Sequence, residues 1–374
     1  MKILYVTTIG GTMVFFQSFI RQLIEQGHTV DIACSYPDKV GQCYLELGCK
    51  TYPLSCSRSP LDKGNLSAVK QLKKIVEENH YDIVHCHTPI AAACTRIACR
   101  KVRKQGTKVF YTAHGFHFYK GAPLKNWLIF YPIEKLCARW TDVLITINRE
   151  DYALAQRKLK AKKVAYVPGV GIDVEKFANA QVDRAAKRQE IGVPEDAFLL
   201  FSVGELNENK NHQVVIRALA QLNEPNIHYA VAGKGGMHEK LETLARELGI
   251  EKQVHLLGYR TDAAELYKTA DVFVHPSFRE GLPVSIMEAR AAGLPVICSD
   301  IRGCTDLVND GQEGYLADPR CYNTFAKAID KIRVSNPIQG KSKVTSFVIY
   351  STGEINCRLH NLYEDARFTT GEKR

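Results

Sequence analysis

The sequence predicts an α/β fold made of two doubly wound domains of parallel sheet, and three observations support this prediction. Apolar runs alternate with helical patterns along most of the chain, as they do in parallel sheets joined by helical crossovers. The length of 374 residues exceeds what one hydrophobic core usually serves. The alternation stops between Pro168 and Pro194, where glycines and polar residues gather, and then resumes.

The N-terminal half carries six apolar runs with helical patterns between them. We expect strands at 3–8, 30–34, 83–86, 109–112, 143–147 and 164–167, and helices at 14–26, 66–79, 90–104, 124–139 and 149–159. Threonines and glycines interrupt the first apolar stretch, so we interpret it as a strand rather than as a signal peptide. Together these elements predict a first domain at 1–170.

The C-terminal half repeats the alternation after a linker expected at 171–197. In a second domain at 198–350 we expect strands at 198–203, 227–232, 253–257, 272–275 and 294–298, and helices at 211–222, 237–248, 263–269 and from Pro283. The segment 336–350 shows no clear period and is left unassigned. Ser351 and Glu354 form a capping box that opens a last helix in 351–374, which we expect to pack back on the first domain.

Charge is distributed unevenly between the two halves. Residues 1–173 carry 25 Lys and Arg against 13 Asp and Glu, whereas residues 174–374 carry 25 against 27. Basic side chains cluster at 96–108 and 157–163, on either side of the aromatic stretch 127–132. An anionic membrane surface would attract such a face. The alternative is a plain solvated basic surface, with Trp127 and Phe130 as core residues. Nucleic acid is not expected as a partner, because zinc-finger spacing, an RNP-like aromatic run and a basic zipper are all missing.

The cysteines and the hydropathy bear on the compartment. The twelve cysteines contain no C-x-x-C pair and fall mostly within apolar runs, which is typical of a reducing environment. No run of about 18 apolar residues occurs. We therefore expect a cytoplasmic protein that associates peripherally with the inner face of the cell membrane.

The segment from Glu280 to Glu288 is the most informative motif. Pro283 suits the first turn of a helix, so the free backbone amides after Glu280 can face an anion such as a diphosphate. Glu288 lies roughly 7 to 8 Å further along the helix, where a carboxylate can accept hydrogen bonds from ribose hydroxyls. In the alternative reading, Glu280 stabilises the positive helix end and Glu288 is solvated. The amides in question belong to Gly281, Leu282 and Val284.

With this motif, the chain resembles glycosyltransferase family 4 of the bacterial surface-polysaccharide type, whose members have two facing Rossmann-like domains, the GT-B architecture. The resemblance runs from residue 1 to about residue 333 and continues in the last helix. It implies that Glu280 contacts the hydroxyls of the donor sugar and that Glu288 contacts the ribose. It also implies a catalytic set of His114, Lys210 and Glu280.

A second segment runs from Gly204 through Lys210 and is similar to the family's strand, glycine and lysine sequence. The resemblance implies that Lys210 meets the donor diphosphate as a point charge. Glu205 stands where many family members carry an arginine, which leaves Lys210 as the main expected cation. Alternatively, Lys210 is an ordinary lysine near a helix start and Asn211 caps that helix.

Four further segments complete the resemblance. His114 follows a predicted strand and is implied to lie near the reacting sugar, although a structural histidine is the alternative. Gly10 and Gly11 follow the first strand and, with His87, are assigned to the acceptor side. A metal site at His85 and His87 is not expected, because an H-x-H pair alone is a weak signal. The donor side adds Gly233, an ordinary turn in the alternative reading, and the nucleobase segment at Tyr259 and Arg260.

The activity that we expect is retaining transfer of a hexose or N-acetylhexosamine from a nucleotide diphosphate sugar, expected to be a UDP-sugar, to a polyprenyl-diphosphate-linked surface glycan. No D-x-D pair occurs, so we expect neither a metal nor another cofactor, and the diphosphate is expected to be stabilised electrostatically. The alternatives are a nucleotide-sugar 2-epimerase and a non-catalytic nucleotide-sugar-binding subunit of a polysaccharide complex.

Overall fold

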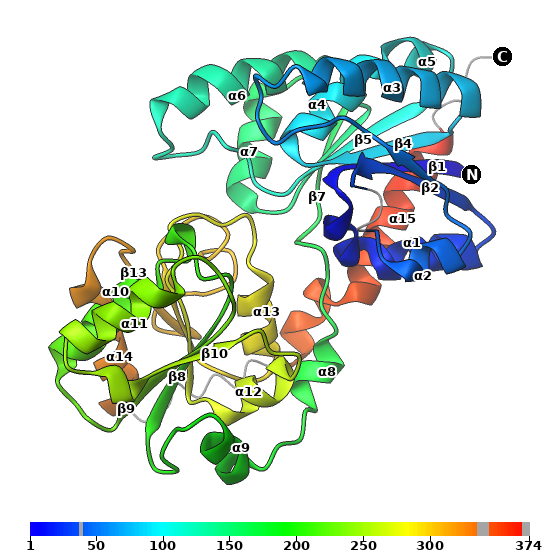
Figure 1. The fold of residues 1–374 in the computed structure, drawn as a ribbon. Coiled ribbons are helices and arrows are strands. Elements are labelled where there is room, and N and C mark those ends of the chain that lie inside the picture. Colours follow the sequence, from blue (N-terminus) through cyan, green and yellow to red (C-terminus); the bar gives the residue numbers. More distant parts are fainter. Residues whose placement is uncertain (37–39, 335–343, 369–374) are drawn as a thin grey trace. The chain divides into compact units, whose positions relative to one another are not determined.

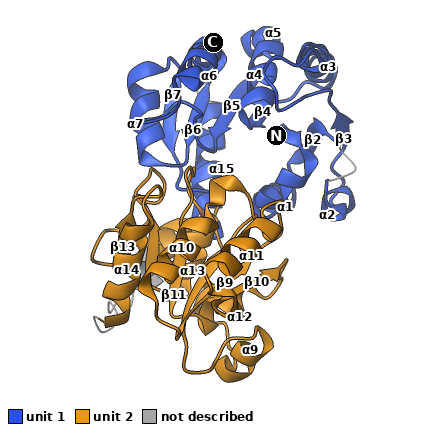
Figure 2. Cartoon of the chain, turned by 60° about the vertical axis from the view of Figure 1, so that its left-hand side comes forward, with its two compact units in different colours: residues 1–170, 352–374 blue, residues 171–351 orange. Residues whose placement is uncertain are grey.

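The computed structural model describes residues 1–36, 40–334 and 344–368. The chain forms two compact units, which are coloured separately in Figure 2. Unit 1 comprises Met1–Val170 and Thr352–Arg374, and unit 2 comprises Gly171–Ser351. Each unit is built around one parallel sheet, in agreement with the predicted fold class.

Unit 1 contains a seven-stranded sheet in the order β3-β2-β1-β4-β5-β6-β7, and all neighbouring strands are parallel. The strand order reverses between β1 and β4, which is the topological switch point where ligands bind in doubly wound sheets. The strands are β1 (Lys2–Ile9), β2 (Thr29–Ser35), β3 (Thr51–Pro53), β4 (Ile83–His87), β5 (Lys108–Ala113), β6 (Val143–Thr146) and β7 (Lys163–Tyr166).

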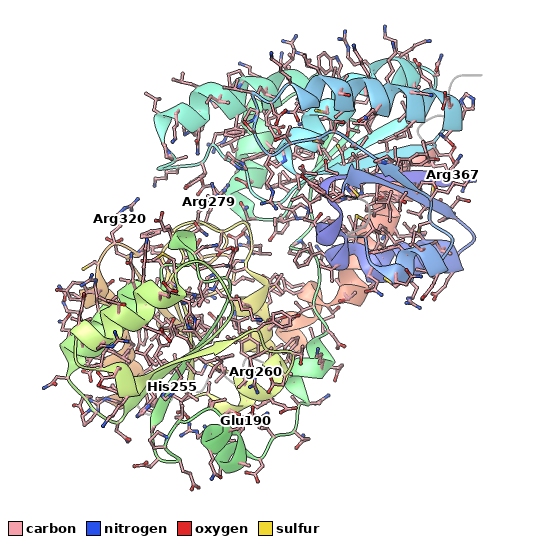
Figure 3. All side chains as sticks on the ribbon, viewed as in Figure 1. Glu190, His255, Arg260, Arg279, Arg320 and Arg367 are labelled. Atoms are coloured by element: carbon pink, nitrogen blue, oxygen red, sulfur yellow. The ribbon has the colours of Figure 1, made fainter. Side chains whose placement is uncertain are left out.

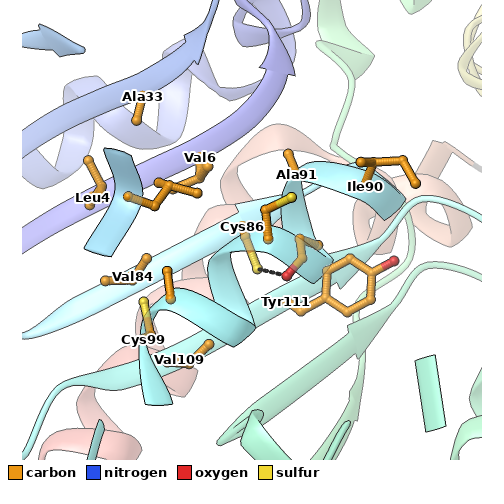
Figure 4. Packing of buried hydrophobic residues seen from close by; sticks show 14 of the residues in the cluster. Leu4, Val6, Ala33, Val84, Cys86, Ile90, Ala91, Cys99, Val109 and Tyr111 are labelled. Atoms are coloured by element: carbon orange, nitrogen blue, oxygen red, sulfur yellow. Dashed lines mark hydrogen bonds between the residues drawn. The ribbon is translucent and has the colours of Figure 1, made fainter. Parts of the chain in front are cut away.

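Side chains of β1 alternate between two hydrophobic cores, one on each face of the sheet. Leu4 and Val6 join the core beneath α3 and α4, which Figure 4 shows from close by. Ile3 and Tyr5 join the core beneath α1 and α15, to which Tyr363 contributes. Burial on both faces is the reason that β1 reads as a continuous apolar run rather than as an alternating one.

Helices cover both faces of this sheet, as Figure 1 shows. The last helix, α15, packs on α1 although it lies at the other end of the chain. The helices of unit 1 are η1 (Gly10–Phe16), α1 (Gln17–Glu25), α2 (Gln42–Glu46), α3 (Gly64–Asn79), α4 (Pro89–Ala98), α5 (Arg100–Lys104), α6 (Leu124–Cys137), η3 (Ala138–Trp140), α7 (Arg149–Lys158) and α15 (Thr352–Phe368).

Unit 2 contains a six-stranded parallel sheet in the order β10-β9-β8-β11-β12-β13, with its switch point between β8 and β11. Its strands are β8 (Phe198–Val203), β9 (Ile227–Ala232), β10 (Val254–Gly258), β11 (Val272–His275), β12 (Val296–Ser299) and β13 (Gly314–Ala317). Its helices are α8 (Val174–Ala178), α9 (Arg184–Glu190), η4 (Glu208–Lys210), α10 (His212–Leu222), α11 (His238–Glu247), η5 (Glu251–Gln253), α12 (Ala263–Thr269), α13 (Val284–Ala291), α14 (Tyr322–Val334) and η6 (Val344–Tyr350).

The structure differs from the prediction where short polar elements are held by tertiary contacts. The segment 171–197, expected as a linker, belongs to unit 2 and contains α8 and α9. Asp173 and Asp183 cap these helices by accepting hydrogen bonds from backbone amides, a signal that the sequence already carried. The short elements α2 and β3 and the later elements β13 and α14 were not predicted.

Two further differences concern a predicted helix and the unassigned segment. The single helix expected at 90–104 divides at Cys99 into α4 and α5. Of the unassigned segment 336–350, the first part lies outside the described residues, and the remainder is η6.

Candidate active site

In unit 2 the predicted donor residues gather at the switch point between β8 and β11. The loop after β8 and the loop after β11 are joined by a backbone hydrogen bond, in which the Phe278 amide donates to the Asn209 carbonyl at 2.8 Å. Asn211 is the N-cap residue of α10, as the alternative reading expected, but its side chain does not cap the helix and instead donates its amide to the carbonyls of Pro276 and Pro319. These bonds hold Gly204, Lys210 and Glu280 in one neighbourhood.

Lys210 and Glu280 form an ion pair with 2.8 Å between Nζ and Oε1, although they are far apart in sequence. The same Oε1 lies 3.0 Å from His275 Nε2. Burial lowers the pKa of His275, so the neutral ring donates Nε2–H to the carboxylate. Ser285 lies within hydrogen-bond reach of the other ring nitrogen, at 3.3 Å, and can donate its hydroxyl to it.

The electrostatic balance at Glu280 favours the ionised carboxylate. Burial alone would raise the pKa of Glu280, but the hydrogen bond from His275 and the charge of Lys210 outweigh it and leave the pKa well below the usual value. A preformed, mostly buried lysine–glutamate pair can exchange partners when an anion reaches Lys210. The released Glu280 carboxylate can then accept hydrogen bonds from hydroxyl groups.

Helix α13 begins directly after this pair. Pro283 is its N-cap residue rather than its first helical residue, and no side chain caps the helix. Gly303, at φ +79°, packs so closely on the Gly281 carbonyl that a Cβ atom would collide with it. The amides at the start of α13 can therefore interact with an anion.

Glu288 has a partner that the helical neighbours did not reveal. The hydroxyl of Tyr267, on α12, lies 2.9 Å from Glu288 Oε2 and 3.2 Å from the Ser285 carbonyl. Burial raises the pKa of Glu288, and the hydrogen bond from Tyr267 opposes this shift. The alternative reading, in which Glu288 is merely solvated, is therefore wrong, because this partly buried carboxylate accepts a hydrogen bond from Tyr267.

The glycine loops after β8 and β9 pack directly on each other. A Cβ atom on Gly233 would overlap the Gly204 carbonyl, whose carbon would be only 2.8 Å away. Gly235 is also packed closely, on the backbone of Leu206. Glu205 is held aside, since its Oε2 accepts a hydrogen bond from Asn207 at 3.0 Å. These contacts explain why glycine is needed at the predicted position 233.

The two residues of the predicted nucleobase segment have different surroundings. Tyr259 is exposed, whereas Arg260 pairs with Asp262 and Glu190 at 2.5 Å each. Figure 3 labels Arg260 and Glu190, which come from the segment after β10 and from α9. The structure therefore does not bring the Arg260 side chain to Lys210 and Glu280, and its role in donor binding stays a prediction.

In unit 1 the predicted histidines lie at the carboxyl ends of β4 and β5. His87 Nδ1 lies 3.1 Å from His114 Nε2, and Phe16 packs on the His87 ring at 4.2 Å between centroids. Desolvation lowers the pKa of His114 to about 4 and that of His87 well below its usual value, so both rings are neutral at pH 7. Neutral histidines suit hydrogen bonding to a sugar more than charge stabilisation.

His85 forms a separate network on the same strand. Its Nδ1 lies 2.6 Å from the Tyr363 hydroxyl and its Nε2 lies 2.8 Å from the Thr112 hydroxyl. Both ring nitrogens are therefore engaged within the fold. Across 1–36, 40–334 and 344–368, no three His, Cys, Asp or Glu side chains form a group that could hold a metal ion.

The glycines after β1 have unequal surroundings. The strand continues to Ile9, and Gly10 then packs on the backbone of Tyr36 and Val40. Gly11 has open space around its Cα. Sequence reasoning missed His275 and Tyr267 as site residues. His275 ends a predicted strand five residues before Glu280, a signal that could have been used, whereas nothing local pointed to Tyr267.

Comparisons with known proteins identify the family. The family described as "Glycosyl transferases group 1" matches residues 183–341, and "Glycosyl transferase 4-like" matches residues 2–148. The protein named "Putative glycosyltransferase EpsD" of Bacillus subtilis (strain 168) is 38% identical over 336 residues, covering 88% of this chain and 87% of that protein. A UDP-Gal:alpha-D-GlcNAc-diphosphoundecaprenol alpha-1,3-galactosyltransferase of Escherichia coli is 30% identical over 281 residues, covering 72% of each.

Solved structures show the same fold. The crystal structure of Anabaena Alr3699/HepE in complex with UDP-glucose has a TM-score of 0.79 and 21% identity, and covers 98% of this chain and 100% of that one. WaaG, a glycosyltransferase involved in lipopolysaccharide biosynthesis, has a TM-score of 0.72 and 20% identity, and covers 96% and 99%. The chain therefore belongs to the group 1 glycosyltransferases of GT-B architecture, as its sequence motifs predicted.

Proposed function

We propose that this glycosyltransferase moves a hexose or N-acetylhexosamine from a UDP-sugar to a polyprenyl-diphosphate-linked glycan in polysaccharide biosynthesis, with retention of anomeric configuration. The observation that carries the proposal is the arrangement of Lys210, Glu280 and the start of α13 at the switch point of unit 2. A cation and free amides side by side provide what a departing diphosphate requires.

The donor assignment draws on two further points. Glu288 is a partly buried carboxylate on α13, the helix whose amides would hold the diphosphate. From this position it can accept hydrogen bonds from the ribose hydroxyls. Among the proteins of similar fold, HepE has been crystallised with UDP and with UDP-glucose. The acceptor assignment is supported by the Escherichia coli relative, whose name specifies a diphosphoundecaprenol-linked acceptor.

In this proposal each residue has a defined role. Lys210 and the α13 amides stabilise the charge that develops on the leaving diphosphate, and Glu280, released from Lys210, holds the donor sugar by its hydroxyls. A donor phosphate oxygen accepts the proton of the attacking hydroxyl, and the sugar bond forms on the face that the diphosphate leaves. His114, kept neutral by desolvation and oriented by His87, hydrogen-bonds the sugar.

The experiment incubates the purified protein with a panel of nucleotide sugars and a polyprenyl-diphosphate-linked acceptor, and follows UDP release and the anomeric form of the product. Lys210→Ala should reduce turnover at least ~10²-fold, while Lys327→Ala, at an exposed position of α14 in the same unit, serves as the matched control. Inversion at the anomeric carbon would refute the stereochemical part. Formation of a free epimer, or tight binding without turnover, would refute transfer.

A further inference from the structure

Helix α6 presents apolar side chains on its outer face as well as on the face that packs on unit 1. Trp127, Phe130 and Tyr131 pack against the core on the inner side. On the outer side Leu124 is 74% exposed and Leu128 is 68% exposed. The exposed outer face also includes Ile129, Pro132 and Leu136. A helix that is apolar around its circumference needs an apolar environment on both sides, which protein supplies on only one side here.

The helix is fixed so that this outer face cannot turn inward. Glu134, the only acidic residue of α6, lies on the inner side and receives two hydrogen bonds from the buried Arg96, at 2.8 and 3.0 Å. The Trp127 indole N–H donates to the Tyr119 carbonyl at 3.3 Å. The exposed leucines are therefore a permanent property of the fold rather than the result of a loose helix.

The charges that accompany the outer face are all positive. Within α6 these are Lys125 and Lys135, both exposed, and Arg139 follows in η3. Figure 1 shows α6, α4 and α3 in one layer over the same face of the sheet, and α6 packs directly on α4. The short basic helix α5 continues this layer after α4. Two copies of such a face would repel each other, whereas an anionic surface would be attracted.

We infer that the outer face of α6 is a docking surface for an anionic lipid bilayer. Its leucines enter the boundary between headgroups and acyl chains, and Lys125 and Lys135 extend to the lipid phosphates. This inference rests on the proposed function in one respect, because a polyprenyl-linked acceptor presents its glycan at such a surface.

Vesicle co-sedimentation tests the inference. The wild-type protein should pellet with vesicles of phosphatidylcholine and phosphatidylglycerol in equal parts, and should remain in solution with phosphatidylcholine alone. The variant L124Q/L128Q should bind the anionic vesicles at least about tenfold more weakly. The variant K125Q/K135Q should lose most of the dependence on salt. The control is L45Q, because Leu45 is 47% exposed on α2, which packs on the opposite face of the sheet.

Intrinsic fluorescence gives a second readout, since both tryptophans of the chain, Trp127 and Trp140, lie in or just after α6. Their emission should shift to the blue on binding in the wild type and in L45Q. Circular dichroism and UDP binding confirm that each variant is folded. Equal binding to neutral vesicles, or wild-type binding by L124Q/L128Q, would overturn the inference. A dimer in solution that L124Q/L128Q dissociates would also overturn it, because a second copy would then cover the face.

Failure of the inference can be distinguished from failure of the proposed function. Vesicle binding requires no donor and no turnover. A protein that binds anionic vesicles through α6 but transfers no sugar would leave the inference intact and reject the function. A protein that transfers sugar to a water-soluble short-chain acceptor but does not bind vesicles would reject the inference and leave the proposed function intact.

Discussion

Gly233→Ala is the substitution for which the structure gives the clearest magnitude. A Cβ atom at position 233 would overlap the carbonyl of Gly204 and would lie 2.8 Å from its carbon, against 3.4–4 Å for an ordinary contact. The three nearest neighbours of this Cβ atom are backbone atoms, so no flexible side chain can move aside. Because the Gly204 carbonyl oxygen would lie only 1.8 Å from this Cβ atom and ordinary contact begins at 3.4 Å, the loops after β8 and β9 must separate by at least about 1.6 Å.

The expected cost follows from how tightly the two loops are joined. Overpacking a fitted interior typically costs about 1–3 kcal/mol, and we expect the upper end because the Gly204 amide is hydrogen-bonded to the Ala232 carbonyl next to the collision. For a domain of about this size each kcal/mol lowers the melting temperature by roughly 2–4 °C. A loss of roughly 6–12 °C is thus expected for the transition of unit 2.

Function should fall with stability, since Gly204 also packs on the Lys210 side chain. A displacement of roughly 1 Å near a charged contact can reduce turnover by about 10²-fold. Scanning calorimetry and UDP release measure the two effects, and Gly236→Ala is the matched control because a Cβ atom there meets nothing within 4 Å. If Gly233→Ala melts and turns over like Gly236→Ala, the packing of the two loops described above is wrong.

Three other substitutions test the buried carboxylates. Glu288→Gln should raise the melting temperature at pH 7 while weakening UDP binding, because burial raises the pKa of Glu288 and the folded state holds the charged form at a cost. Calorimetry should show that this gain in melting temperature vanishes below about pH 4. A lower melting temperature of the variant at pH 7 would contradict the prediction. Glu280→Gln should have the opposite sign, because the pKa of Glu280 is lowered and its stabilisation, present above about pH 4.5, is lost as the pH falls through the folded-state pKa. Urea unfolding from pH 7 downward checks this, and a pH-independent difference would refute it. Glu134→Gln leaves Arg96 buried without its carboxylate and should cost ~3–5 kcal/mol, whereas replacing both residues by methionine should cost far less, as a double-mutant cycle would show.

Local patterns in the sequence predicted most of the framework. Continuous apolar runs predicted the central strands because these strands are buried on both faces. The strands at 198–203, 227–232 and 272–275 coincide with β8, β9 and β11. Short elements such as β3, with only partly buried side chains, carry too weak a pattern to be recognised, and tertiary pairing with β2 defines them.

For the candidate site, too, the sequence determined one part and the tertiary structure another. Sequence alone determined which chemical groups occur near each strand end, including Lys210, Glu280 and Glu288, because parallel strands bring their carboxyl ends to one edge. Only the tertiary structure decided the partners: His275 and Lys210 for Glu280, and Tyr267 for Glu288. Hydrogen bonds and ion pairs act over about 3 Å, a distance that depends on how loops from separate crossovers pack. Helical periodicity describes neighbours within one element and therefore could not reveal those partners.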